Sequence, residues 1–334
     1  MVRQINEYHP IIGHRYIPGI QARIPHESGG YLVQTNSSGF RCKHEFVKEK
    51  PDKSFRVLLF GDSFTAGDGV SNKYRFGDLL EQRVSGLQVL NFGLPGTGTD
   101  QQYLAFEHYA HDVTYDLLLI CPLVQNIKRV ASRYEMVITR ENGDVGFMAK
   151  PYFELQNGEL ALRNTPVAKG IFERGDLESG DNFQVSQGTA ERILRGFVNR
   201  YMYSVKNLLQ KTVSYDPVAE YSDSNGREWV LMKSILTHWA RRANGIPVVI
   251  CPIPLYQHVE ELSSPVNYQG RFAELSDEPN VRIHDPLYRF WEESIETRRR
   301  CRFEVDQHFT QLGHSIMADA LMSVIVEAMK VREK

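Results

Sequence analysis

Short apolar runs alternate with segments of helical periodicity along much of the chain. Each run has the length of a strand, and continuous apolar runs of this kind are typical of parallel strands buried on both faces. The five runs cover residues 57–60, 87–90, 117–121, 246–251 and 281–285. Apolar residues recur at intervals of three and four in residues 74–85, 99–111 and 228–244, and in a last segment that ends near residue 329. This alternation predicts βαβ units built around a parallel sheet.

The pattern divides the chain into three parts. Residues 1–50 contain several prolines and glycines and little periodicity, and we interpret them as an extended N-terminal segment packed on the core. Residues 51–127 and 228–334 carry the alternating pattern and are predicted to form one α/β domain. Residues 128–227 interrupt this domain as an insertion or lid that shapes the substrate site. Within the insertion, we expect short hairpins in residues 133–163, with Asn142-Gly143 as a turn, and a helix over 189–210.

Composition narrows the possible functions. The chain has 334 residues, of which 42% are hydrophobic and 24% charged, as in ordinary globular proteins. A net charge of -2 gives no strong field for nucleic acid, so no such partner is expected. No run approaches the roughly 18 apolar residues of a membrane span. The first residues show no charged-then-apolar signal peptide, so a cytoplasmic location is expected.

The four cysteines show no CxxC spacing, which argues against a zinc site and against a disulfide framework. Cys121 and Cys251 lie within apolar runs and are expected to be buried thiols. No cluster of histidines and carboxylates has ligand spacing either, so no metal is expected.

A candidate nucleophile follows the first apolar run. Gly61-Asp62-Ser63 stands where the strand must turn, and small residues follow it. A serine at the carboxyl end of an inner strand lies at the rim of the sheet, where α/β proteins place their ligand crevice. Its backbone N–H lies near the start of the next helix and can help to hold an anion. The alternative is that Asp62 and Ser63 only cap a helix.

Two further loops carry candidate hydrogen-bond donors. The second run leads into the glycine-rich turn at residues 91–98, where backbone N–H groups can face a ligand closely. This turn lacks the GxGxxG spacing, so a dinucleotide cofactor is not indicated and no cofactor is expected. Asn126 lies just after the third run, at the same predicted edge of the sheet.

A candidate base precedes the last helix. Asp306 and His308 are two residues apart, and in an extended turn the aspartate can accept a hydrogen bond from the histidine Nδ1–H. This bond would leave Nε2 free to take a proton from a serine. The alternative is that Asp306 caps a turn and His308 is a surface residue. His314 fits the start of the helix better than a catalytic role.

Taken together, Gly61-Asp62-Ser63, Asn91-Phe92-Gly93, Asn126 and Asp306-Gln307-His308 resemble the four signature blocks of the SGNH/GDSL hydrolase family, a family of serine esterases. The blocks occur in the family's order, and the match covers roughly residues 50–130 and 228–330. The resemblance implies an α/β fold, namely a flavodoxin-like three-layer α/β/α sandwich with a central, mostly parallel sheet. It places the serine and the histidine on separate loops at one edge of that sheet.

The family's roles transfer residue by residue. Ser63 resembles the nucleophile, His308 the general base and Asp306 the acid that orients it. The Ser63 N–H, the Gly93 N–H and the Asn126 side-chain amide resemble the oxyanion hole. This division is chemically sound, because a serine hydroxyl is a weak nucleophile without an adjacent base, and a tetrahedral oxyanion needs preorganised donors. An asparagine amide donates hydrogen bonds without titrating.

Two blocks depart from the family pattern. The third usually reads Gly-x-Asn-Asp, whereas Asn126 has neither that glycine before it nor an aspartate after it. The fourth usually spaces aspartate and histidine three apart, and here they are two apart, which resembles members that act on acetyl groups of bacterial polysaccharides. The insertion resembles a subgroup associated with polysaccharide or secondary-metabolite gene clusters. The resemblance therefore implies a serine ester hydrolase that cleaves a small acyl ester, O-acetyl above all, on a carbohydrate or secondary metabolite.

Two other functions stay open on the sequence. An acyltransferase would use the same triad with an acceptor alcohol in place of water. A non-catalytic binding protein could have the same fold, although it would have no need for Ser63, Asp306 and His308 together.

Overall fold

A five-stranded parallel sheet forms the centre of the protein. The computed structural model describes residues 5–138, 145–173 and 216–332. The sheet has the order β13-β12-β7-β5-β6, and all four strand pairs are parallel. Its strands are β5 (Phe55–Gly61), β6 (Leu87–Asn91), β7 (Leu117–Cys121), β12 (Val248–Ile250) and β13 (Val281–Ile283). Numbered along the chain, this order is 2-1-3-4-5, the flavodoxin-like arrangement, so the predicted fold class is confirmed.

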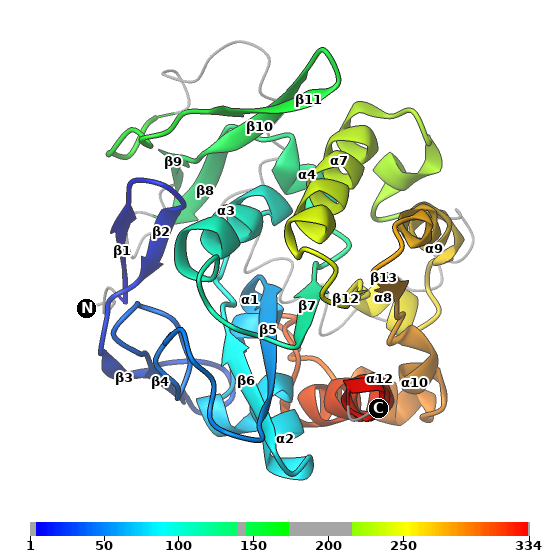
Figure 1. Ribbon diagram of the computed structural model, residues 1–334. Helices are drawn as coiled ribbons and strands as arrows, with labels where there is room; N and C mark the ends of the chain where they lie inside the picture. The colour runs from blue at the N-terminus through cyan, green and yellow to red at the C-terminus, as the bar shows by residue number, and fades with distance from the viewer. Residues whose placement is uncertain (1–4, 139–144, 174–215, 333–334) are drawn as a thin grey trace.

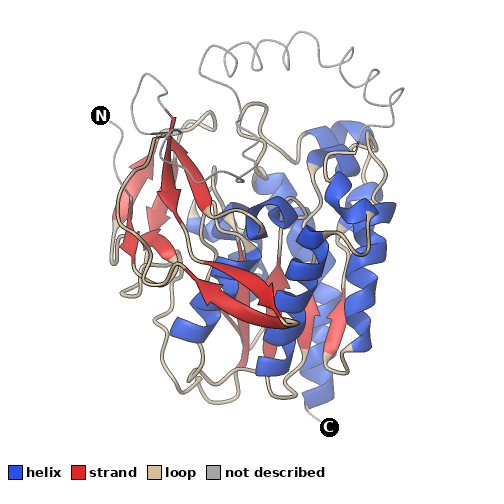
Figure 2. Ribbon diagram, turned by 90° about the horizontal axis from the view of Figure 1, so that it is seen from above, coloured by secondary structure: helices blue, strands red, loops and turns tan. Residues whose placement is uncertain are grey.

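Helices cover both faces of the sheet (Figures 1 and 2). Successive residues of a strand point to opposite faces, and β5 shows what each face meets. Leu59 faces helix α2, where a side-chain carbon built on Gly77 would lie only 2.8 Å from the leucine. Phe60 faces the other layer and packs edge-on against Phe106 and Trp239. The first layer contains α2 (Phe76–Arg83) and α12 (Gln311–Arg332), and the second contains α3 (Thr99–Tyr109), α4 (Asn126–Val130) and α7 (Arg227–Arg242).

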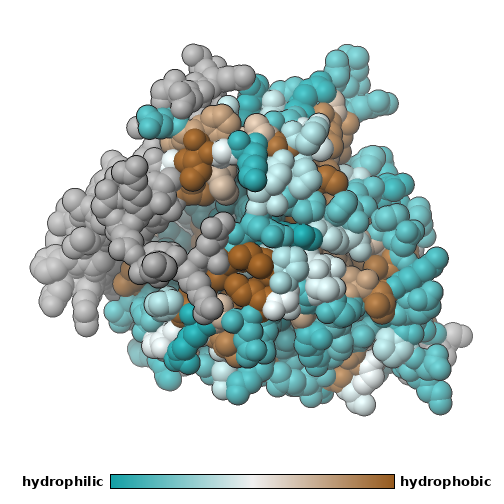
Figure 3. Space-filling model, turned by 90° about the vertical axis from the view of Figure 1, so that its left-hand side faces the viewer, coloured by the Kyte–Doolittle hydropathy of each residue, from teal (hydrophilic) through white to brown (hydrophobic). Residues whose placement is uncertain are grey.

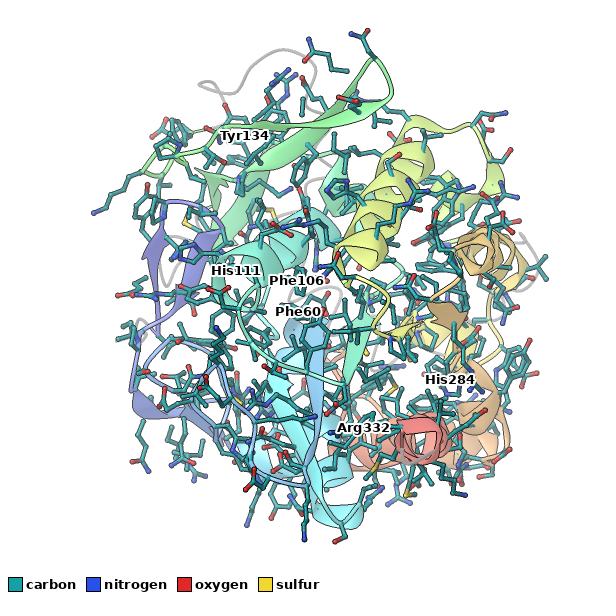
Figure 4. All side chains as sticks on the ribbon, viewed as in Figure 1. Phe60, Phe106, His111, Tyr134, His284 and Arg332 are labelled. Carbon is teal, nitrogen blue, oxygen red and sulfur yellow. The ribbon has the colours of Figure 1, made fainter. Side chains whose placement is uncertain are left out.

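Aromatic side chains pack together between the sheet and the second layer, where Phe60 of β5 and Phe106 of α3 lie close to each other (Figure 4). Phe60 stacks on Phe92 with ring centroids 4.5 Å apart, and Trp239 of α7 is fully buried beside it. The apolar runs that predicted the strands are buried throughout β5 and β7, because helices shield both faces. Cys121 and Cys251 are buried free thiols, as predicted.

Helix α12 has 22 residues and is, among the described helices, the one long and apolar enough to cross a membrane by length and composition. Its apolar side chains pack in the layer with α2 and α10, and nine of its residues are buried. Short helices connect the remaining elements: α1 (Ser63–Ala66), α8 (Tyr256–Val259), α9 (Val266–Ala273), α10 (Leu287–Trp291) and α11 (Ile295–Arg299), with 3₁₀ turns at η1 (Asn72–Tyr74), η3 (Ala219–Ser222) and η4 (Glu274–Asp277).

The N-terminal segment contains two antiparallel hairpins that its sequence did not predict. They pair β1 (Asn6–His9) with β2 (Gly13–Tyr16) and β3 (Gln21–Ile24) with β4 (Tyr31–Gln34). Each strand has four residues, too few for a clear alternation of apolar and polar positions. Beyond β4, the buried Arg41 guanidinium donates to the carbonyls of Gly67 (2.8 Å) and Val70 (2.7 Å). The segment is therefore bound directly to the loop that follows the candidate serine.

The insertion contributes two more hairpins, which the sequence predicted. They pair β8 (Tyr134–Ile138) with β9 (Val145–Ala149) and β10 (Tyr152–Gln156) with β11 (Glu159–Arg163). The buried Lys150 between β9 and β10 forms an ion pair with Asp100 of α3 and donates to the Arg129 carbonyl at 3.0 Å. The predicted Asn142-Gly143 turn and the predicted helix over 189–210 lie outside the described residues.

A stability test follows from the close packing of Gly93. A side-chain carbon at this position would lie 2.4 Å from the backbone nitrogen of Ala66. A flexible side chain could change its rotamer to relieve such a clash, but the backbone of α1 cannot. Gly93→Ala is expected to lower the free energy of unfolding by about 1–3 kcal/mol, measured by urea denaturation. Gly270→Ala is the matched control, because no described atom lies within 4 Å of the added carbon and the helix favours alanine. Equal effects of both substitutions would contradict the packing argument.

Candidate active site

Ser63 lies at the carboxyl end of the central strand β5, as its sequence position predicts. The Asp62 side chain caps α1 by accepting from the Phe64 N–H at 3.1 Å, so the capping alternative holds for Asp62. Gly67 then ends the helix after one turn with φ +78°, a backbone conformation that glycine adopts without strain. This single turn holds the Ser63 side chain against the loop before α12.

Ser63, His308 and Asp306 form one hydrogen-bonded line. The His308 Nε2 lies 2.7 Å from the Ser63 Oγ, although the two residues are 245 positions apart in the sequence. The His308 Nδ1 lies 2.7 Å from the Asp306 Oδ2. Gln307 between them has φ +65°, and this left-handed turn accompanies the spacing of two residues between the acid and the base. The structure thus brings together the three residues that the sequence singled out for catalysis.

The charges around His308 favour its protonated form. Burial by itself lowers the pKa of His308, but the hydrogen bond to Asp306 and the charges of Asp68 and Asp306 outweigh it and raise the pKa above 6.5. Burial would raise the pKa of Asp306, but its hydrogen bonds with His308 and His26 outweigh this effect and lower the pKa. Asp306 therefore stays a carboxylate that fixes the ring, and the ring is a stronger base than free histidine.

Asp68 is a second carboxylate near the ring that the sequence did not single out. It lies five residues after Ser63, and its N–H donates to the Ser63 carbonyl at 3.0 Å. Among the described residues, its carboxylate makes long contacts, 3.5 Å to the Tyr16 hydroxyl and 3.9 Å to the Arg41 guanidinium. Burial raises the pKa of Asp68, and the charge of Asp68 in turn raises the pKa of His308.

Asn126 presents an open donor beside the serine turn. Its Oδ1 accepts from the Arg129 Nη1 at 3.0 Å, and the same nitrogen donates to the Asp62 Oδ2 at 2.8 Å. Arg129 therefore binds Asn126 to the residue next to Ser63. The amide oxygen is therefore occupied. The amide nitrogen, Nδ2, is buried and has no acceptor among the described residues. The missing glycine and aspartate of the family pattern do not prevent this placement, because Arg129 fixes the amide.

Gly93 differs from its predicted role as an open donor. Its N–H donates to the Asn91 Oδ1 at 2.8 Å, and the Asn91 Nδ2 donates to the Thr65 carbonyl at 3.0 Å. The Asn91 side chain thus connects the turn after β6 to α1, and its oxygen is the acceptor of the Gly93 N–H. The tight contact of Gly93 with α1 gives this glycine a packing role.

His314 and His284 make their hydrogen bonds away from this line. The buried His314 accepts from the Phe76 N–H at 3.3 Å at the start of α12. The His284 Nε2 contacts the Ala320 carbonyl at 2.8 Å. Among the described residues, no group of three His, Cys, Asp or Glu side chains is arranged to hold a metal ion.

Several solved structures are similar to this chain. A member of the lipolytic protein G-D-S-L family from Veillonella parvula is 12% identical, with 82% of this chain and 99% of that chain covered and a TM-score of 0.42. A lipase/acylhydrolase from Enterococcus faecalis is 13% identical, with 83% and 96% covered and a TM-score of 0.42. An acetyl xylan esterase is 12% identical, with 81% and 99% covered and a TM-score of 0.44.

No protein-family description matches the sequence, and no curated protein sequence is similar to it. The chain resembles the SGNH/GDSL hydrolases. The motifs and the geometry of Ser63, His308 and Asp306 are the features of the chain that bear on its function.

The charges around His308 give a direct test. The imidazole of His308 is expected to titrate above pH 6.5 when followed by proton NMR of its ring. Asp68→Asn removes a negative charge that favours the imidazolium, so the titration should move to lower pH. Asp112→Asn, which changes an exposed carboxylate paired with His111, is the control and should leave His308 unchanged. A His308 midpoint at or below 6.5, or one that ignores Asp68, would contradict this account.

Proposed function

We propose that the protein is a serine ester hydrolase. The observation that supports this proposal most directly is the line from the Ser63 Oγ through His308 to Asp306, with both contacts at 2.7 Å. A serine becomes a useful nucleophile when a positioned base can take its proton, and the base needs a partner that fixes its tautomer. Ser63, His308 and Asp306 are placed to act as the nucleophile, the base and the partner of the base.

The reaction would proceed through an acyl-enzyme. Asp306 accepts from the His308 Nδ1–H, which leaves Nε2 with a lone pair facing Ser63. As the Ser63 oxygen attacks the acyl carbon, Nε2 takes the hydroxyl proton, and it then delivers that proton to the leaving alcohol. Water next attacks the acyl carbon while the His308 Nε2 takes a proton from the water. Nε2 then returns this proton to the Ser63 oxygen as the bond between that oxygen and the acyl carbon breaks, and the free acid leaves.

Two groups are suited to the oxyanion of the tetrahedral intermediate. They are the Ser63 N–H, at the start of α1, and the Asn126 Nδ2, whose oxygen is held by Arg129. Each is the first residue of a short helix, α1 or α4, so little reorganisation is needed as negative charge develops. We assign Gly93 the packing role described above, because its N–H already donates to Asn91.

We further propose that the substrate is a small acyl ester, with O-acetyl on a carbohydrate or secondary metabolite as the leading class. The two-residue spacing of Asp306 and His308 supports this choice through the resemblance stated above. On the face shown in Figure 3, hydrophobic residues outside the grey region form small, separated patches among hydrophilic ones.

Ester hydrolysis on a panel of short acyl esters tests the reaction. The panel contains p-nitrophenyl acetate to octanoate and an acetylated sugar. Ser63→Ala and His308→Ala should each lower kcat by about 10³-fold or more, because nucleophile and base act as a unit. Ser276→Ala, at an exposed serine in η4, is the control and should keep wild-type activity. Hydrolysis that survives Ser63→Ala would overturn the mechanism.

The same panel separates hydrolysis from acyl transfer. With an added sugar alcohol, a transferase would form a new ester at the expense of free acid, whereas a hydrolase would release the acid at an unchanged rate. Labelling of Ser63 by a fluorophosphonate would distinguish either enzyme from a non-catalytic binding protein, since only an activated serine reacts quickly.

The role of Asn126 has its own test. Asn126→Ala removes one donor to the oxyanion and should lower kcat by about 10²–10³-fold with little change in KM. Gln125→Ala, at the exposed neighbouring side chain, is the matched control and should leave kcat unchanged. A rise in KM alone, or no effect of Asn126→Ala, would remove Asn126 from the oxyanion hole.

A further inference from the structure

A second histidine contacts the carboxylate of Asp306. His26 lies in the turn between β3 and β4 of the N-terminal segment, 280 residues before Asp306 in the sequence. Its Nε2 lies 3.1 Å from the Asp306 Oδ2, and this oxygen is also 2.7 Å from the His308 Nδ1. One carboxylate oxygen is therefore shared by two imidazole rings.

The hydrogen bonds of His26 fix its tautomer. The backbone N–H of Ser28 donates to the His26 Nδ1 at 3.1 Å, so this nitrogen carries a lone pair. In the neutral ring the proton then resides on Nε2, which donates to Asp306. No positive charge on His26 is needed for this contact.

Aromatic packing fixes the position of the His26 ring. Phe303 and Tyr31 pack edge-on against it, with ring centroids 4.6 and 5.7 Å away, and its side chain is only 12% exposed. A side-chain carbon on Gly69 would lie 2.4 Å from the Phe303 ring and 3.0 Å from the His26 Cε1. The His26 ring is therefore closely packed against the loop that follows Ser63 and against the loop before α12.

The neighbouring Glu27 holds the backbone of the same loop. Its carboxylate accepts from the N–H groups of Glu304 (3.2 Å), Val305 (3.1 Å) and Asp306 (2.8 Å). These three residues are exposed, and Val305 is 63% exposed, so they have little packing of their own. The Phe303 N–H closes the loop by donating to the His308 carbonyl at 2.9 Å, and Glu27 adds charge-assisted hydrogen bonds from the N-terminal turn.

We propose that His26 is a positioning residue for catalysis, and this inference rests on the proposed function. His26 holds the Asp306 carboxylate in the orientation that receives the His308 Nδ1–H, and Glu27 holds the backbone that carries Asp306. Without the His26 donor, the Asp306 side chain, which is 34% exposed, is free to rotate toward water. His308 then loses the partner that fixes its tautomer and its direction toward Ser63.

Two substitutions separate the hydrogen bond of His26 from its packing. His26→Phe keeps an aromatic ring between Phe303 and Tyr31 but lacks the donor, and it should lower kcat about tenfold with KM nearly unchanged. His26→Gln keeps an N–H donor of similar reach and should retain most of the activity. In an Asp306→Ala background, His26→Phe should have no further effect, because the two residues act through one contact.

A spectroscopic readout makes the test independent of turnover. In the wild type, the proton shared by His308 and Asp306 should give a low-field proton NMR signal, which His26→Gln keeps and His26→Phe weakens or shifts upfield. Circular dichroism and thermal unfolding establish whether each variant is folded. Should His26→Phe not fold, the smaller His26→Leu, which also lacks the donor, takes its place and is expected to weaken the same signal.

Two outcomes would overturn the proposal for His26. One is a His26→Phe or, in its place, His26→Leu protein with the wild-type low-field signal and kcat. The other is an equal loss in His26→Gln and His26→Phe that persists in the Asp306→Ala background. By contrast, a wild-type protein that shows the signal but neither hydrolyses esters nor reacts with a fluorophosphonate would refute the proposed function, and the signal in the variants would still decide whether His26 positions Asp306.

Discussion

The hydrogen bond between Ser63 and His308 is the contact on which the candidate site depends. It joins the central strand of the sheet to the loop before the last helix, across 245 residues of sequence. Parallel strands make this meeting possible, because their carboxyl ends all lie at one edge. Around this contact, Arg41 holds the loop after Ser63, Arg129 connects Asp62 to Asn126, and Asp306 orients the base. These contacts hold the two segments that place the Ser63 Oγ 2.7 Å from the His308 Nε2.

Much of the fold could be predicted because the central strands are buried on both faces. A strand with that environment is apolar at every position, as in Leu117–Cys121, and such a run is easy to recognise. The candidate residues Ser63, Asp306 and His308 could be found for a related reason. Each stands in a short local motif at the end of an element, and the pairing of acid and base spans only two residues.

The other contacts of the candidate site could not be predicted from the sequence, because most of them join residues that are distant in the chain. His26 and Glu27 lie in a short, polar turn, and nothing near them indicates that Asp306 lies opposite. Asp68 appeared as one more polar residue in a glycine-rich loop. The Gly93 N–H matched a family motif, but whether a backbone donor is open depends on its neighbours, and here Asn91 accepts from it.

The contact between the N-terminal turn and the Asp306 loop also bears on how the protein acquires its chemistry during synthesis. His26 emerges from the ribosome about 280 residues before its partner, and closing a flexible loop of that length opposes folding by about 5 kcal/mol of chain entropy. The sheet must therefore form first and bring both segments within reach. A nascent chain that has not yet released residues 304–308 contains Ser63 but lacks His308, so under the proposed function an activated serine would arise only late in synthesis.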